Sequence, residues 1–250
     1  MKLEVVTLSM FFALGLTGCG GNGDDWANQD PSAKALSPIG FDIEAAWSNF
    51  NLTPNSKEMT ISGSCTGRLI LSNKAASYIG TSTTLYNYSN VNRLYQTCNA
   101  PFASLTGASA YYDITNYYTL SDNRLKNFQY NYGTTINRWR TLPSFPTFAM
   151  VGDTGLIGVI DNCSSTCTLS NKLGVEEWSY IIEEDTASSV VFNLIVKAYN
   201  TTTSTTDTDY LSAPVVQTEQ YRYVLEQDSP VLMLRTYDIE KATGFKLHAQ

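Results

Sequence analysis

The sequence predicts a mainly β protein: an antiparallel meander that forms a curled sheet or partial barrel, with a short amphipathic helix near the N-terminus. The first observation is composition, because only 16% of residues are charged while tyrosine occurs 16 times and Ser and Thr are abundant. The second is that alternating apolar segments, separated by short turn sequences, fill the second half of the chain. Sequential strands joined by short turns pair with their neighbours, and a sheet this long must curl or close.

The N-terminus predicts export. The apolar run from Val5 to Leu16 has the length of the apolar region of a secretory signal, and it is shorter than the ~20 residues that a spanning helix needs. Thr17, Gly18 and Cys19 follow this run directly. The alternative interpretation is an ordinary cleaved signal with an incidental cysteine.

The stretch Leu16-Thr17-Gly18-Cys19 resembles the lipobox of bacterial lipoproteins. The resemblance implies a signal peptide over residues 1–18 and a lipidated Cys19 that carries palmitate-type acyl chains. Gly20 occupies the position where aspartate signals inner-membrane retention in enteric lipoproteins, so the resemblance also implies outer-membrane sorting. We therefore expect a lipid-anchored outer-membrane protein, on the periplasmic face or the cell surface, with the membrane as one partner.

Residues 19–38 are predicted to be a flexible tether, since they are rich in Gly, Asn, Asp, Ser and Pro and show no periodicity. Residues 39–250 are predicted to be a single antiparallel β domain. Within it, residues 111–142 have an unusual Tyr-rich composition and are expected to form an insertion.

The cysteines predict disulfide bonds. Five cysteines less Cys19 leave four, an even number in an oxidising compartment, and three pairings are open. We favour the pairing in which the short segment between Cys163 and Cys167 closes on itself, which leaves Cys65 with Cys98. A redox-active pair would need Cys-x-x-Cys spacing, which is absent.

The first half of the domain begins with the helix. Residues 41–50 place Phe41 or Ile43, Trp47 and Phe50 on one face at helical spacing, so we expect a helix that caps an open end of the sheet with its aromatic residues in the core. Three strands are expected next, over 58–71 with a kink or bulge at its glycines, over 76–88 and over 91–97.

Aromatic and basic side chains in and beside the Tyr-rich region are candidate ligand-binding residues, because aromatic rings flanked by Arg can stack sugars or peptides. The alternative is that these tyrosines simply pack on the domain with their hydroxyls in water. The candidates are Tyr111, Tyr112, Tyr117, Tyr118, Arg138 and Trp139.

The second half of the domain shows a cleaner strand pattern. In one segment Trp178, Tyr180 and Ile182 fall on the same side, and in the next the even-numbered positions from Val190 to Ala198 are predicted to be buried. The expected strands are 156–160, 175–183, 189–199, 221–225, 231–237 and 245–248.

Several landmarks resemble a group of uncharacterised envelope lipoproteins from proteobacteria. The resemblance implies an envelope lipoprotein and no particular activity. These landmarks are Ile61-Ser-Gly-Ser-Cys65-Thr-Gly67, Cys98-Asn99-Ala100-Pro101, Gly152-Asp153-Thr154-Gly155 and the run from Tyr180 to Asn200.

Composition excludes several functions. The net charge of −7 disfavours nucleic acid as a partner. The only histidine is His248, close to the C-terminus, which disfavours Ser-His-Asp chemistry and His-ligated metals. We expect no cofactor, no metal and no catalytic residue, and instead a non-catalytic binding or structural module whose partner is an envelope protein, a glycan or a small ligand.

The alternative function is a carboxylate-based hydrolase of envelope glycans. It would need Glu176 or Glu177 to face Glu183 or Glu184 across a cleft, as the paired acids of glycosidases do. The Asp153-Thr154-Gly155 triplet matches the aspartic-protease motif, but it occurs once, and a turn explains it.

Overall fold

The computed structural model of the chain describes residues 40–77, 84–121, 124–132, 135–164, 167–168, 171–199, 209–227 and 231–250. The expected signal peptide, Cys19 and the expected tether lie outside these residues, as do the side chains of 75–89 and 110–135.

The described part of the chain is mainly β, as predicted. Its helices are α1 (Ile43–Leu52) and the short 3-10 turns η2 (Ala103–Leu105) and η4 (Asp209–Ser212). Its strands are β1 (Asn55–Gly63), β2 (Cys65–Ser77), β3 (Thr84–Cys98), β4 (Ser109–Ser121), β5 (Arg124–Tyr132), β6 (Thr135–Trp139), β7 (Thr154–Cys163), β8 (Lys172–Thr186), β9 (Ser189–Tyr199), β10 (Val215–Glu226), β11 (Met233–Lys241) and β12 (Lys246–Ala249).

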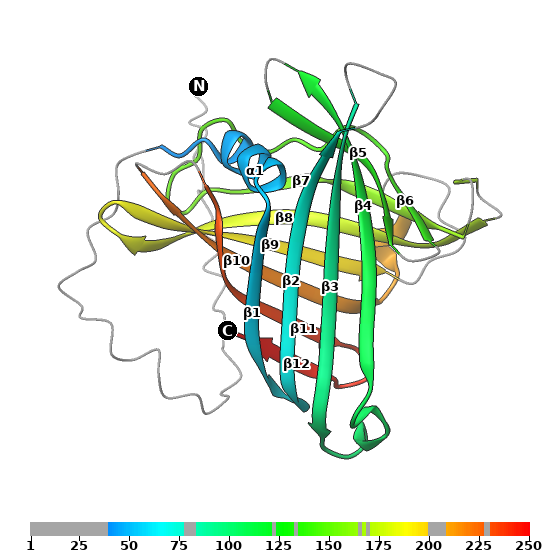
Figure 1. Cartoon of the computed structure of the whole chain (residues 1–250). Coiled ribbons are helices and arrows are strands. Elements are labelled where there is room, and N and C mark those ends of the chain that lie inside the picture. Colours follow the sequence, from blue (N-terminus) through cyan, green and yellow to red (C-terminus); the bar gives the residue numbers. More distant parts are fainter. Residues whose placement is uncertain are drawn as a thin grey trace, which may run out of the picture. The chain divides into compact units, whose positions relative to one another are not determined.

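The strands form an antiparallel meander, which confirms the predicted topology. Each strand pairs with the strands before and after it in the sequence, and β1 also pairs with β12, so the order closes into a barrel (Figure 1). The closing contact is short, since β1 and β12 share only the pairs from Ile61↔Ala249 to Gly63↔Leu247.

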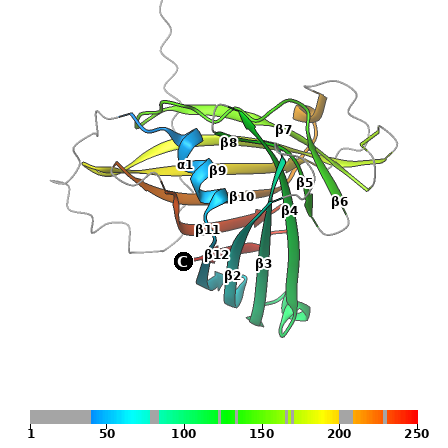
Figure 2. The ribbon, with the colours of Figure 1, turned by 45° about the horizontal axis from the view of Figure 1, so that its top comes forward.

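The barrel has two walls whose strands cross. Figures 1 and 2 both show β2, β3 and β4 running steeply across the direction of β8, β9, β10 and β11. Side chains alternate between the two faces of each strand, so each wall contributes every second residue to the interior.

The interior face of β9 is the predicted one, although Val191 and Asn193 on its other face are also buried and Ala198 is half-buried. On β9, Val190, Phe192, Leu194 and Val196 are all buried in the interior. Trp178, Tyr180 and Ile182 on β8 pack against the same cluster, which confirms their predicted common face.

A second core cluster fills the opposite part of the interior. It contains Met59, Ile61 and Leu69 from β1 and β2, Tyr237 and Ile239 from β11, and the cysteines Cys65 and Cys98. The cavity described below lies where these two clusters leave the interior unfilled.

The predicted single strand over 58–71 is wrong, because the chain folds there as a hairpin of β1 and β2. Gly63 ends β1 with φ of 106°, and a Cβ at this position would lie 2.7 Å from the carbonyl oxygen of Lys246. The register shift between Thr66 and Gly67 leaves Gln96 of β3 without a register partner, so the bulge is on β3 opposite Gly67, and Gly63 belongs to the turn. Likewise, the predicted strand 76–88 divides between the end of β2 and the start of β3.

Both predicted disulfide pairs are confirmed at bonding distance. The Sγ atoms of Cys65 and Cys98 are 2.03 Å apart, and these residues are register partners on β2 and β3. The Sγ atoms of Cys163 and Cys167 are 2.25 Å apart.

Candidate functional site

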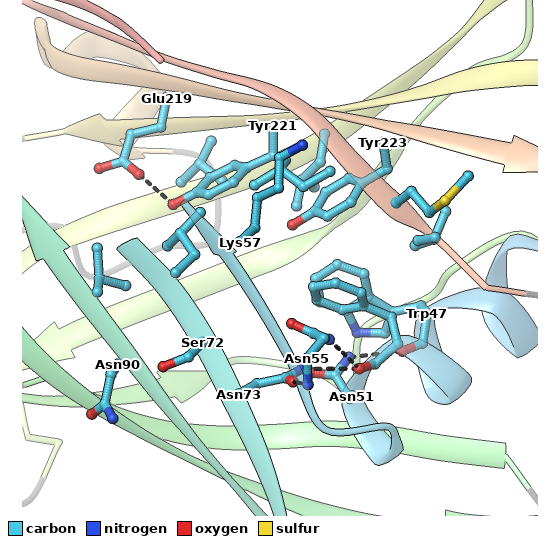
Figure 3. Close-up of a pocket in the computed structure, with 18 of the residues that line it drawn as sticks. Trp47, Asn51, Asn55, Lys57, Ser72, Asn73, Asn90, Glu219, Tyr221 and Tyr223 are labelled. Carbon is cyan, nitrogen blue, oxygen red and sulfur yellow. Dashed lines mark hydrogen bonds between the residues drawn. The ribbon is translucent and has the colours of Figure 1, made fainter. Parts of the chain in front are cut away.

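A cavity of about 510 Å³ lies in the barrel interior next to α1 (Figure 3). This volume is within the range of small-molecule sites, about 300–1,000 Å³. Its lining comes from both walls and from the helix. The lining residues are Trp47, Phe50, Asn51, Thr53, Asn55, Ser56, Lys57, Leu71, Ser72, Asn73, Asn90, Val91, Glu176, Trp178, Leu194, Val196, Ala198, Gln217, Glu219, Tyr221, Tyr223, Val231, Leu232, Met233 and Leu234.

Hydrogen bonds at both ends fix α1 over the cavity. Asp42 caps the N-terminus by accepting a 2.9 Å bond from the backbone N–H of Ala45. At the C-terminal end, Asn73 on β2 donates a 2.9 Å bond from Nδ2 to the carbonyl oxygen of Phe50, which has no partner within the helix. Asn73 also accepts a 2.9 Å bond from the backbone N–H of Asn55. These contacts tie the helix to the start of β1 and to β2.

The helix gives the cavity an aromatic end. The ring of Trp47 stacks on Phe145 with centroids 4.9 Å apart and meets Tyr223 edge-on at 6.2 Å. Phe50 meets Tyr223 at 5.3 Å. Such ring pairs hold their geometry, so this part of the lining is a preformed apolar surface.

The lining becomes polar along β8, β9 and β10. Near the helix, the residues that lie side by side on these three strands are Ile182, Phe192 and Tyr223. Six residues farther along the strands, the residues that lie side by side are Glu176, Ala198 and Gln217. At ~3.3 Å per residue, the two sets are about 20 Å apart. The cavity therefore offers an apolar region at one end and polar groups at the other.

A partly buried hydrogen-bond network underlies the middle of the cavity. Glu219 accepts hydrogen bonds from the hydroxyls of Tyr221 and Tyr237, the latter at 2.8 Å, and from Nε2 of Gln217. Arg93 on β3 donates a 2.7 Å bond to the Tyr237 hydroxyl. Every partner that these bonds give Glu219 is a donor, so both of its carboxylate oxygens are used as acceptors.

The tyrosines of this network remain protonated at neutral pH. Burial raises the pKa of Tyr221 well above its ordinary value, and the charge of Glu219 raises it further. Burial also raises the pKa of Tyr237, with the opposing effects of Glu219 and Arg93 added to it. Both hydroxyls can therefore act as permanent donors to Glu219.

The cavity opens beside residues 55–59 of β1. β12 pairs with β1 only from Ile61 onward, and residues 55–59 have a strand partner on the β2 side alone among the described residues. Several lining residues at this place are exposed to solvent, and they mark the mouth of the cavity. They are Thr53, Ser56, Lys57 and Met233.

Lys57 is the charged residue at this mouth. It shares the inward side of β1 with the buried residues Met59 and Ile61, and it lines the cavity. Its register partner Leu71 and the next partner, Val91 on β3, line the cavity as well. Its ammonium makes no hydrogen bond or ion pair with any described part of the chain. An exposed charged side chain thus lies at the entrance of an otherwise apolar and hydrogen-bonded interior.

The sequence-predicted ligand residues are only partly described. Tyr111, Tyr112, Tyr117 and Tyr118 lie on β4, and their side chains are outside the described part of the structure. β4 pairs with β3 over its length, so the Tyr-rich segment contributes a wall strand.

Arg138 and Trp139 do not form one binding surface. Arg138 is exposed, whereas Trp139 is only 4% exposed and meets Trp178 edge-on at 5.3 Å in the core. Their places as neighbours on β6 send them to opposite faces. Trp139 is a core residue beside the cavity rather than part of an external aromatic platform.

The acidic residues of the hydrolase alternative are not brought together. Glu176 lines the cavity, where it accepts bonds from Asn162 at 3.0 Å and from the Trp178 indole at 3.1 Å. Glu177, on the other face of β8, accepts a 2.8 Å bond from the Tyr210 hydroxyl. Glu183 lies six residues along the strand from Glu177, about 20 Å away, which is about twice the separation that glycosidase acids use.

The only histidine is held in place. His248 lies on β12, and its Nδ1 is 2.7 Å from Oδ1 of Asp238. In the described ranges, no group of three or more His, Cys, Asp or Glu side chains is arranged to hold a metal ion.

Sequence reasoning missed the cavity lining. The inward residues Gln217 and Glu219 alternate on β10 with Thr218 and Gln220, which are just as polar, so alternation does not reveal which side faces in. The part of the sequence that did indicate the site was the helix. It was predicted to cap the sheet with Trp47 and Phe50 facing inward, and the contacts of both rings agree with this prediction.

Comparison of the chain with known protein families, with curated proteins and with solved structures finds no match. Among the described residues, no helix combines the length and apolarity that crossing a bilayer requires.

Proposed function

We propose that this protein is a non-catalytic binding module of the bacterial envelope that holds a small, largely apolar molecule inside its barrel. The observation that carries the proposal is the interior cavity of about 510 Å³ with an aromatic end and a limited set of polar groups. Ligand sites combine a mostly apolar lining with a few placed polar groups in this way. Of the partner classes that the sequence suggests, a small ligand is favoured over an envelope protein or a glycan.

The proposal includes anchoring through Cys19 to the outer membrane. It is supported by the lipobox-like residues Leu16 to Cys19 and by the composition of residues 19–38, which suits a flexible tether. An anchored barrel with an apolar interior would keep a poorly soluble molecule close to the membrane surface. No observation favours the hydrolase alternative over this function.

Binding of N-phenylnaphthylamine tests the proposal, because this neutral probe becomes fluorescent in apolar surroundings. We expect saturable fluorescence with the wild-type protein. Replacing Ala198, which lines the cavity, with the larger Trp (Ala198→Trp) should fill space that the probe occupies and weaken binding about tenfold or more.

The matched control is Lys197→Trp, which adds the same ring at the neighbouring position, on the outward face of β9. This variant should bind the probe like the wild type. Absence of saturable binding, or equal loss in both variants, would refute binding in the cavity. Urea denaturation of both variants separates loss of the site from loss of the fold.

A further inference from the structure

We infer that the ligand is an amphipathic anion, whose carboxylate or phosphate head binds at Lys57 while its apolar part lies against the aromatic end of the cavity. This inference rests on the proposed function and adds the chemical class of the ligand. It follows from which polar groups of the lining already have partners, from where Lys57 stands and from the donors that remain.

The charged side chains that line the cavity differ in whether they have hydrogen-bond partners. Three charged residues line the cavity, Lys57, Glu176 and Glu219. Both carboxylates accept hydrogen bonds from neighbouring side chains, as described above. Lys57 has no such partner in the described residues. A cationic ligand would have to displace existing donors, whereas an anion gains a charge-assisted bond at no cost to the network.

The position of Lys57 suits the head of an amphipathic molecule. A charged group is expensive to bury, so the head of such a ligand remains near water while its apolar chain enters the interior. Lys57 is exposed at the mouth, where β1 lacks a partner from β12, and the aromatic rings of Trp47 and Tyr223 line the same cavity (Figure 3). Polar and apolar parts of one molecule thus meet matching surfaces.

A second unsatisfied donor near the cavity is Nε1 of Trp47, which is buried and has no hydrogen-bond partner in the described part of the chain. This atom exposes no surface to the cavity, so a ligand oxygen does not reach it in this structure. Lys57 is therefore the charged donor of the lining that is open to an anionic head.

The overall charge makes anion preference informative. At −7 the chain repels anions in general, so preference for an anion over a neutral molecule of equal size must come from a local group. Lys57 is the group that the lining provides.

The test is displacement of N-phenylnaphthylamine by four amphiphiles with the same dodecyl-length chain: dodecanoate, dodecyl phosphate, dodecanol and dodecylamine. With the wild type, we expect the two anions to compete about tenfold better than dodecanol, and dodecylamine to compete least. The two anionic arms distinguish a free carboxylate from a phosphate head. In Lys57→Gln the advantage of the anions over dodecanol should disappear, while dodecanol competes as before.

The first control is Lys57→Arg, which keeps the charge and should keep the preference for anions over dodecanol. The second control is Lys74→Gln, which should keep this preference as well. Lys74 is an exposed lysine on the neighbouring strand β2, on the face opposite to Leu71 and Asn73. Equal competition by anions and dodecanol in the wild type, or an unchanged preference in Lys57→Gln, would overturn the inference. Either result would leave the proposed function standing, because dodecanol and the probe would still bind. Failure of every probe would instead remove the proposed function itself.

Discussion

Nη2 of Arg93 on β3 lies 2.7 Å from the hydroxyl oxygen of Tyr237 on β11, and this hydrogen bond spans the interior between strands that do not pair. The guanidinium also lies over the ring of the same tyrosine, 5.6 Å from its centroid. The two walls of the barrel are thereby joined through their inner faces as well as around the sheet. Glu219 belongs to the same network.

Replacing Arg93 with Met should destabilise the fold by about 2 to 3 kcal/mol, because a buried donor to a network that contains a carboxylate is lost. Urea denaturation measures this change. Arg68→Met on β2 is the control, because Arg68 makes an exposed ion pair with Glu58 at 3.7 Å. Loss of this pair should lower the free energy of unfolding by less than about 1 kcal/mol. Similar losses in both variants would contradict a structural role for the network.

The two disulfides should differ in their contribution to stability. Cys65 and Cys98 are 33 residues apart in sequence, and on the chain-entropy account their bond contributes about 3 to 4 kcal/mol. The bond between Cys163 and Cys167, which are 4 residues apart, contributes about 2 kcal/mol on the same account. The free energies of unfolding of the two double Cys→Ser variants measure both terms. A larger loss from the short loop would show that strain or packing dominates.

Stability at acid pH should depend on Asp185. Burial raises the pKa of this carboxyl, but hydrogen bonds from Arg235 and Ser189 and the charge of Arg235 outweigh burial and lower the pKa below 3.8. A carboxyl with a lower pKa in the folded state stabilises the fold above its unfolded pKa. This contribution is lost as pH falls through the folded pKa.

The urea midpoint should therefore fall less steeply between about pH 5 and about pH 2 in Asp185→Asn than in the wild type. Glu240→Gln, which removes an exposed partner of Lys246, provides the comparison and should leave the slope nearly unchanged. An identical acid profile for Asp185→Asn and the wild type would show that this ion pair does not set the acid limit.

Cys19→Ala should abolish incorporation of labelled palmitate and release the protein from the membrane fraction of the cells that make it. The proposed lipidation is at Cys19, the cysteine of the lipobox-like sequence. Cys167→Ser keeps Cys19 and should retain the label. Persistent labelling of Cys19→Ala would place the lipid elsewhere or exclude it.

Local patterns in the sequence were sufficient to predict those features for which a single structural interpretation fits the pattern. The strand over 189–199 was predicted with the bounds that β9 has, because five inward apolar residues alternate without interruption. The pairing of Cys163 with Cys167 followed from a short loop, and it left Cys65 with Cys98. The helix followed from the spacing of Trp47 and Phe50.

The remaining features depend on contacts that sequence spacing does not reveal. Gly63 and Gly67 both suit a turn or a bulge, and the pairing of β1 with β2 decides that Gly63 belongs to the turn. Trp139 was a candidate for ligand stacking because Arg residues flank it, yet the packing of β6 against β8 buries it. Lys57 resembles any exposed lysine until it and its register partner Leu71 are seen to line the cavity.

The closing pair of strands has a consequence for how the molecule is made. Ser62 and His248, opposite each other on β1 and β12, are 186 residues apart in sequence, so this seam forms only after almost the whole domain has been synthesised. Contacts between such distant residues slow folding. Until the seam forms, both margins of the sheet offer open backbone groups to any neighbouring copy, which is the hazard of edge strands. Recovery from denaturant should accordingly decline as protein concentration rises, and newly made chains would benefit from a holding chaperone during this interval.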